Sequence, residues 1–464
     1  MKIKQYLSVL ATAIFCCACT LDIPYENQFS DPDAVATPEA ARELLATAYN
    51  SLPNPEFDLS CLADDFETTY LISKNTSLAN QYNWQPAALE SLALTLWQGY
   101  YGVIASINAL LERIPTVACA TPEEEEALQI VESEAKVLKA ACYFDLLRLF
   151  APAYDEGGNQ PGIVLKDRLE MELLARSPID SCVTAIRNLL TASQQTVCQP
   201  EDCYWLGNSS AEYLLAELAL YTGEYSEAAR HAENLLDSYS DDVLSENSYA
   251  GLWSDGDCPE RIFSLYTTQS FYTAINYDRE KGDYLTVNRA IVTQFDPNDL
   301  RYQASIQWFR MPGQIIGDTT DVPNLGKYNR LNWEQTEIRY INKFRLSGAY
   351  LVLAEAYCRL GDSRAATVLN DYLRQRRATL TETSLSRDDL LKRILEERHK
   401  EFIGEGTRYF DLKRCRKDLL QNWCSTSSRN INANDYRWTF PIPKEEYLYN
   451  EFMEQNDGWT KIES

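Results

Sequence analysis

Two stretches of the sequence share one pattern of small and aliphatic residues, and this pattern constrains the fold most strongly. They occupy residues 213–229 and 351–366. In each, an apolar run containing Leu-Ala-Glu leads to a glycine, Gly223 or Gly361, and then to an Ala-Ala pair. Small residues let two helices pack closely, and the glycine ends the first helix. The pattern is typical of tetratricopeptide-like helical pairs, and the distance between the copies favours one interrupted scaffold in a mainly α fold.

Helix-start signals support a mainly helical chain. Thr37, Thr121 and Ser177 each precede a proline, and acidic residues follow within the first turn. A hydroxyl at the cap accepts a hydrogen bond from a free N–H group, and proline suits the first helical position, where its missing N–H group is not needed. We therefore predict helices that begin at these three positions, and a further capped helix that starts at Ser386 and ends at Gly404.

The segment from about residue 251 to residue 340 differs in composition from the rest of the chain. It is rich in aromatic, Asn, Asp and Gly residues and has few helical runs. We interpret it as long loops and short strands between an N-terminal helical part, about residues 30–250, and a C-terminal helical part, about residues 341–464. Binding residues concentrate on loops that a rigid scaffold holds, so we expect ligand contacts here.

The N-terminus has the layout of a bacterial lipoprotein signal. Lys2 and Lys4 precede an apolar run, 6–15, which is too short to span a bilayer, and Ala18 precedes Cys19. We predict that residues 1–18 are a signal peptide and that Cys19 is lipidated, with several acyl chains because a single chain anchors only marginally. The alternative is an ordinary cleaved signal with free cysteines nearby.

The strongly acidic composition limits the possible partners. The formal charge is -25 at pH 7, and loss of Lys2 and Lys4 with the signal makes it more negative. Nucleic acid and anionic lipid surfaces are therefore poor partners, and a polar, neutral or cationic ligand is favoured. The acidity is equally explained as a means of keeping an exposed surface soluble.

Cysteine and histidine usage argues against a metal site, and we expect no metal and no cofactor. After the signal is removed, the remaining cysteines form no Cys-x-x-Cys pair, and the chain has two histidines. Two short-loop disulfides remain open, Cys198 with Cys203 and Cys415 with Cys424, because an exported protein meets an oxidising compartment.

Several blocks, in order along the whole chain, resemble the SusD/RagB family of outer-membrane nutrient-binding lipoproteins. They are the predicted lipidated Cys19, LWQGYY at 96–101 with INA at 107–109, EAKVLKA at 134–140 with YF at 143–144, EER at 396–398 with EF at 401–402, GEG at 404–406, RYFDLKR at 408–414, PIP at 441–443, QN at 455–456 and GW at 458–459. The resemblance implies a single domain over residues 19–464, with tetratricopeptide-like pairs as scaffold and irregular loops as ligand platform.

The same resemblance implies a function. Members of this family are non-catalytic partners of a TonB-dependent, SusC-like outer-membrane transporter, to which they present a glycan or peptide fragment. We therefore expect a lipid-anchored protein at the outer membrane that faces the cell exterior and binds an oligosaccharide. A peptide-binding protein and a scaffold for another protein remain as alternatives.

The most recognisable block, residues 396–414, is interpreted as structural. We expect Arg398, Glu401, Arg408 and Asp411 to form ion pairs and caps that hold the last long helix against its neighbours. The adjacent aromatic pair, 409–410, is expected to pack in the core.

Sugar binding requires aromatic faces for the apolar side of the ring and polar groups for the hydroxyls, and two regions combine these residue types. The candidates are Asp65, Tyr70, Tyr82, Asn83 and Trp84 in the first region and Tyr266, Tyr272, Tyr277, Tyr284 and Trp308 in the second.

An enzyme is the main rival class. A glycosidase needs two carboxylates beside the scissile bond, but no motif singles out a pair among the acids of this chain. His399 has no second histidine one turn on, and no Gly-x-Ser-x-Gly motif occurs. We therefore predict that the protein is not an enzyme.

Overall fold

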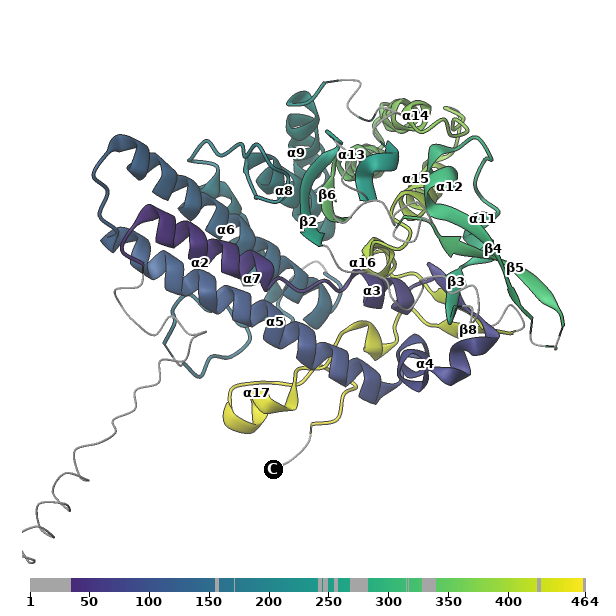
Figure 1. The fold of residues 1–464 in the computed structure, drawn as a ribbon, viewed down its shortest axis with the longest axis horizontal. Coiled ribbons are helices and arrows are strands. Elements are labelled where there is room, and N and C mark those ends of the chain that lie inside the picture. Colours follow the sequence, from purple (N-terminus) through teal and green to yellow (C-terminus); the bar gives the residue numbers. More distant parts are fainter. Residues whose placement is uncertain are drawn as a thin grey trace, which may run out of the picture.

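The computed structural model describes residues 35–461, apart from 155–157, 171, 241–243, 245–248, 254–257, 268–282, 314, 316, 328–338 and 424–426. Cys19, Tyr272 and Tyr277 therefore lie outside the described residues. Within the part that the structure describes, no helix combines the length and the apolar character needed to cross a bilayer. The fold is mainly helical, as the sequence predicts, and most of its short strands lie at one end (Figure 1).

Long helices form the N-terminal half: α2 (Pro38–Asn50), α5 (Pro86–Arg113), α6 (Pro122–Phe150) and α7 (Ile179–Ser193). Ala40 N donates to Thr37 Oγ1 at 3.2 Å and Glu124 N donates to Thr121 Oγ1 at 3.3 Å, which confirms two predicted starts. The third predicted helix is also present, but Pro178 takes the cap position in place of Ser177. Ser177 exchanges main-chain hydrogen bonds with Gly162 and Ile163, so it is held in an extended pairing, and α7 begins two residues later.

Paired helices continue the scaffold with α8 (Asn208–Thr222), α9 (Tyr225–Asp237), α13 (Leu346–Leu360) and α14 (Ala365–Gln375). Gly223 and Gly361 end α8 and α13 with φ of 78° and 73°, a left-handed conformation that costs glycine little. Helix α13 packs against both α9 and α14, although more than a hundred residues separate the two pairs in sequence. The tetratricopeptide-like arrangement predicted from the repeat is therefore present.

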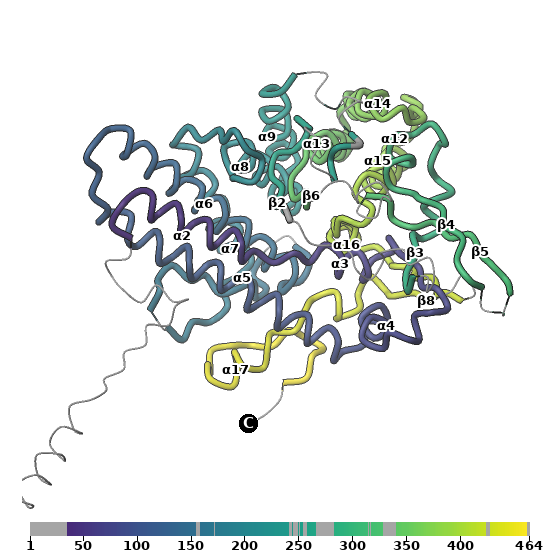
Figure 2. The backbone as a smooth tube through the Cα atoms, viewed as in Figure 1, coloured from purple at the N-terminus to yellow at the C-terminus, as the bar shows by residue number. Residues whose placement is uncertain are grey.

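The last part of the scaffold is α15 (Arg387–Glu401) followed by α16 (Thr407–Arg414). Asp389 N donates to Ser386 Oγ at 3.2 Å, which confirms the predicted cap. Figure 2 shows α16 beside α3 (Glu56–Leu62), a segment from the opposite end of the chain. Gly406 N joins them by donating to Ser60 Oγ at 2.9 Å.

Most of the short strands lie at the end of the molecule away from α2 and α6, and one pair lies nearer the middle, beside α8 and α13 (Figure 1). A four-stranded sheet has the order β3 (Leu285–Val287), β1 (Phe66–Thr68), β7 (Leu419–Trp423) and β8 (Ser427–Ile431). Two antiparallel pairs accompany it, namely β2 (Arg261–Thr267) with β6 (Arg339–Arg345), and β4 (Ile306–Pro312) with β5 (Thr319–Leu325). The remaining elements are η2 (Tyr70–Lys74), α4 (Thr76–Tyr82), η3 (Ile114–Thr116), η4 (Ala250–Trp253), α11 (Arg289–Val292), α12 (Leu300–Ser305), η7 (Tyr436–Trp438) and α17 (Lys444–Tyr449).

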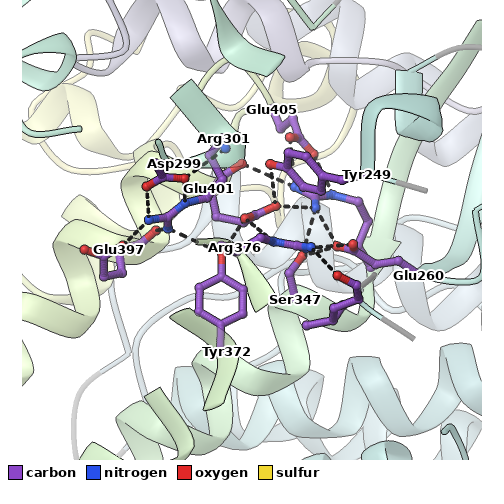
Figure 3. Close-up of polar contacts among 12 residues, drawn as sticks. Tyr249, Glu260, Asp299, Arg301, Ser347, Tyr372, Arg376, Glu397, Glu401 and Glu405 are labelled. Carbon is purple, nitrogen blue, oxygen red and sulfur yellow. Dashed lines mark hydrogen bonds and ion pairs between the residues drawn. The ribbon is translucent and has the colours of Figure 1, made fainter. Parts of the chain in front are cut away.

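A fully buried ion-pair network joins the strands to the C-terminal helices. Figure 3 shows Glu401, at the end of α15, turned toward Arg376, which also meets Glu260. Arg345, the last residue of β6, pairs with Glu260, Glu401 and Glu405 at 2.6–2.9 Å. Because each charge has an opposite partner, the network holds several elements in one geometry without leaving a buried charge alone.

The structural interpretation of residues 396–414 is confirmed. Arg398 pairs with Asp411 at 2.9 Å and with Glu217 at 2.7 Å, so α15 is tied to α16 and to α8. Arg408 pairs with Asp64 at 2.7 Å. The ring of Tyr409 is fully buried in the main core, and Phe410 packs against it.

The possible Cys198–Cys203 disulfide is not formed. The Cys198 sulfur is buried and lies 3.5 Å from the main-chain oxygen of Leu206. The other possible pair cannot be followed, because Cys424 lies outside the described residues.

Candidate functional site

A cleft of about 740 Å³ opens among the short strands and combines the residue types expected at a ligand site. Its walls come from the β1–η2 junction, the β4–β5 hairpin, the start of α11 and the end of β7. The lining residues are Thr68, Thr69, Tyr70, Ile72, Ser73, Thr286, Arg289, Met311, Gly313, Ile315, Asp318, Thr319, Thr320, Val322 and Trp423. Hydroxyl groups and two aromatic rings dominate this lining.

Tyr70 brings together the two regions that the sequence singled out. Its hydroxyl donates to the main-chain oxygen of Pro312, at the end of β4, over 3.0 Å. One residue earlier, Thr69 N donates to the main-chain oxygen of Tyr284 at 2.9 Å. The rings of Tyr70 and Tyr284 pack against a small apolar cluster that includes Met311. The half-buried Tyr70 is therefore held against the hairpin at the edge of the cleft.

Trp423 forms another part of the wall, and sequence reasoning missed it. It lies at the end of β7, where it pairs in parallel register with Thr68. Tyr82, which is 1 % exposed, packs beside it with ring centroids 6.1 Å apart, and the Tyr82 hydroxyl donates to the main-chain oxygen of Asn422 at 2.8 Å. Tyr82 thus supports the neighbouring tryptophan instead of reaching a ligand. The sequence feature that could have pointed to Trp423 is its position as the aromatic residue at the end of the Leu-Leu-Gln-Asn-Trp run.

The charges in the cleft are few and largely compensated. Arg289 pairs with the buried Glu67 and donates to the main-chain oxygen of Asp321 at 3.1 Å. Asp318 is the one carboxylate among the described lining residues. Several hydroxyl groups of the lining donate hydrogen bonds to main-chain oxygens, as Thr286 does to Pro323. Their oxygen atoms can still accept hydrogen bonds from a ligand. The cleft therefore suits an uncharged, hydroxyl-rich ligand.

Two further residues that we predicted to contact the ligand are fully buried, so the prediction is wrong for both. The Trp84 ring is fully buried, packs edge-on against Trp438 at 4.8 Å and donates its Nε1 hydrogen to Leu62 O at 3.1 Å. Asp65 is also fully buried and accepts hydrogen bonds from His399 and from Gly404 N. Side chains enclosed in this way offer no surface to a sugar.

The other predicted residues lie outside the cleft lining. Asn83 follows α4, and its main-chain oxygen accepts from Arg429 at 2.5 Å. Trp308 is 50 % exposed but lies on the opposite face of the hairpin, because Met311 and Val322 face the cleft and side chains alternate along a strand. The Tyr266 main chain lies in β2, opposite Tyr340. Of the predicted set, Tyr70 lines the cleft, and Tyr284 and Tyr82 support its walls.

A larger hollow of about 980 Å³ lies elsewhere, between the ends of α8 and α13 and the helices α15 and α16. Three of the arginines that line it have carboxylate partners: Arg359 and Arg414 pair with Glu355, and Arg408 pairs with Asp64. We favour the smaller cleft as the ligand site because of its hydroxyl and aromatic lining.

Asp64, Asp65 and His399 place potential metal-binding atoms within 4.8 Å of one another. His399 Nε2 lies 2.8 Å from Asp65, and Arg408 grips both oxygens of Asp64. His399 and Arg408 lower the pKa of Asp64 despite its burial. The arginine already supplies the positive charge, so we interpret the cluster as a clamp between α3 and the C-terminal block.

Comparison with known proteins agrees with this architecture. The SusD family model matches residues 320–459, and a model described as starch-binding associating with outer membrane matches residues 24–220. A SusD-like protein of Formosa agariphila is 23 % identical over 86 % of this chain and 88 % of its own length.

Solved structures share the fold. A putative sugar binding protein from Bacteroides vulgatus has a TM-score of 0.76 at 20 % identity and covers 92 % of this chain and 100 % of its own. A SusD superfamily protein from Bacteroides thetaiotaomicron has a TM-score of 0.74 at 22 % identity, over 90 % and 99 % of the two chains. Three observations agree, namely the ordered sequence blocks, the paired-helix scaffold and two family models that match separate parts of the chain. This protein therefore belongs to the SusD/RagB family.

Proposed function

We propose that the protein binds an oligosaccharide in the cleft between η2, the β4–β5 hairpin and β7, and presents it to a SusC-like, TonB-dependent transporter. The observation that carries the proposal is the placement of Tyr70 and Trp423 in one cleft lined by threonine and serine hydroxyls. Aromatic faces cover the apolar side of a pyranose, and hydroxyls and main-chain groups bond its polar edge. Relatives described as sugar-binding support it.

The composition of the cleft favours binding without catalysis. A glycosidase requires two carboxylates on either side of the scissile bond. Among the described residues that line the cleft, Asp318 alone carries a carboxylate, and the nearby Glu67 is buried in an ion pair with Arg289. The ligand therefore leaves the cleft unchanged and is available for uptake.

Calorimetric titration with a panel of neutral oligosaccharides tests the binding proposal. We expect Trp423→Ala to lower affinity about tenfold or more, because the stacking face is lost. Trp308→Ala is the matched control, since it removes the same side chain from the opposite face of the hairpin, and it should bind as the parent does. Equal losses in both variants, or no binding of any glycan or peptide, would contradict the proposal. Chromatography of the mixtures should reveal no hydrolysis products.

The transporter part of the proposal has a separate test. The full-length lipoprotein, tagged at its C-terminus, should co-purify from detergent-solubilised outer membranes with a TonB-dependent transporter. Trp423→Ala should keep this complex while losing glycan affinity. If no transporter co-purifies with either the parent protein or Trp423→Ala, the proposal that the glycan is presented to a transporter is refuted. The proposal that the cleft binds glycan is unaffected by that result.

A further inference from the structure

A third, much smaller cavity lies inside the helical scaffold, apart from the proposed glycan cleft. It has a volume of about 20 Å³ and lies where the end of α6 and the middle of α8 meet α15 and α16. A space of this size holds about one water-sized particle, and it is too small for a phosphate, a sulfate or an organic ligand. Its occupant must therefore be a single small species.

Three hydrogen-bond donors without partners belong to side chains that line this cavity. They are Arg148 Nε, the Tyr221 hydroxyl and Arg398 Nη1, which are buried and contact no acceptor among the described residues. Arg398 is 3 % exposed, and its other nitrogens already bond Asp411 and Glu217. A buried donor left unsatisfied costs about 1–3 kcal/mol, so three at one cavity indicate a missing acceptor.

The chemistry of these donors selects the kind of acceptor. The two guanidinium nitrogens donate and cannot accept, and the hydroxyl of Tyr221 can donate as well. A water molecule accepts two hydrogen bonds and must direct its own hydrogens to other acceptors. A spherical anion accepts from all three donors at once, and hydrogen bonds between charged partners are the stronger kind.

The charged groups around the cavity also favour an anion as its occupant. Four cationic side chains line it, and three of them have carboxylate partners: Arg148 pairs with Asp145, Arg398 with Glu217 and Asp411, and Arg414 with Glu355 and Asp411. Lys413 donates to the main-chain oxygens of residues 148, 149 and 151 and forms no ion pair with a described carboxylate. Burial lowers the pKa of its ammonium group to about 7, which is the response of a buried cation without a counter-charge.

We propose that this cavity binds one small monovalent anion of the halide class, with chloride as the natural candidate, held by Arg148, Tyr221 and Arg398. The anion supplies a negative charge beside Lys413, whose ammonium group bonds main-chain oxygens, and joins the end of α6 to α8 and α15. It serves the scaffold and is independent of glycan binding in the cleft.

Thermal unfolding of the mature protein in sodium chloride and in sodium gluconate, at equal ionic strength, tests the proposal. Chloride should raise Tm in a saturable way, because a ligand that binds only the folded state stabilises it by mass action, whereas gluconate is too large to enter. Equal Tm values in the two salts at every concentration would overturn the proposal.

Tyr221→Phe and a matched control sharpen this test. Without chloride, Tyr221→Phe should be at least as stable as the parent, since it removes an unsatisfied hydroxyl. With chloride, it should require roughly tenfold more salt for the same rise in Tm. Tyr225→Phe, whose ring does not line the cavity, should respond as the parent does. An unchanged chloride response in Tyr221→Phe would contradict the assignment.

A crystallographic measurement identifies the occupant directly. Crystals grown in chloride and soaked in sodium bromide should give an anomalous peak in the cavity, within hydrogen-bonding distance of Arg398. Density with no anomalous signal would identify a water molecule and refute the proposal.

Discussion

Glu401 Oε1 lies 2.6 Å from Arg345 Nη1, and both side chains are excluded from solvent. The pair joins the end of α15 to the end of β6, so it connects the C-terminal helices to the β2–β6 pair. Arg376 bonds the other oxygen of Glu401 at 3.3 Å, and Tyr249 donates to Oε1 at 3.2 Å. Glu401 is therefore the shared acceptor of the network, and its loss should disturb several elements together.

Neutralising Glu401 should destabilise the whole domain. In Glu401→Gln, Arg345 and Arg376 lose a buried counter-charge, and removal of one partner from a buried pair costs about 3–5 kcal/mol. Chemical denaturation followed by circular dichroism measures this change. Glu396→Gln, on the same helix near the surface, is the control and should change stability by less than about 1 kcal/mol. Similar losses in both variants would assign the effect to α15 as a helix instead of to the network.

The network also predicts the direction of the pH dependence. Arginine partners lower the pKa values of Glu401, Glu355 and Asp411 in the folded protein, against the opposing effect of burial. Below about pH 4.5 the unfolded chain binds more protons at these groups than the folded chain does, so stability falls as the pH falls. Unfolding scans between pH 7 and pH 3 should record this loss, and Glu401→Gln should lose less over the same range. An equal slope in the variant would exclude Glu401 as a major contributor.

Trp84 is expected to matter for folding and not for ligand contact. Trp84→Ala leaves a cavity beside Trp438 and removes the hydrogen bond to Leu62, and such truncations cost about 3–5 kcal/mol. Its Tm should fall well below that of Trp423→Ala. At a temperature where the protein remains folded, glycan affinity should match that of the parent. A tenfold affinity loss with unchanged Tm would show that Trp84 reaches the ligand.

Cys19→Ala tests the predicted lipid anchor. Without the acylated cysteine the exported chain has no predicted attachment, so the variant should move from the membrane fraction to the soluble fraction. Fractionation followed by immunoblotting measures this, and protease added to intact cells reports whether the parent protein faces the exterior. Cys61→Ala is a suitable cysteine control and should stay in the membrane fraction.

Local signals in the sequence predicted much of the scaffold. Thr37, Thr121 and Ser386 cap helices as expected because a cap depends on residues within one turn. Ser177 failed as a cap because a distant strand-like pairing with Gly162 competes for its main chain, and no local pattern reveals that pairing.

The candidate site was only partly predictable, for a related reason. Composition located two aromatic regions, and Tyr70 and Tyr284 do meet at the cleft. Burial separated Trp84 and Tyr82 from the surface, and strand pairing brought Trp423 beside Thr68 from the far end of the chain. The side that an aromatic residue faces depends on which segments cover it.

By itself the sequence determined the helical class, the glycine-ended pairs, the family and the structural role of the block containing Arg398 and Tyr409. These properties depend on periodicity, local capping and the order of motifs along the chain. Tertiary structure alone decided which aromatic rings reach solvent, which charges are buried together around Glu401, and where Trp423 lies. The physical reason is that burial and charge pairing are properties of contacts between segments far apart in sequence, and the chain acquires those contacts only when it folds.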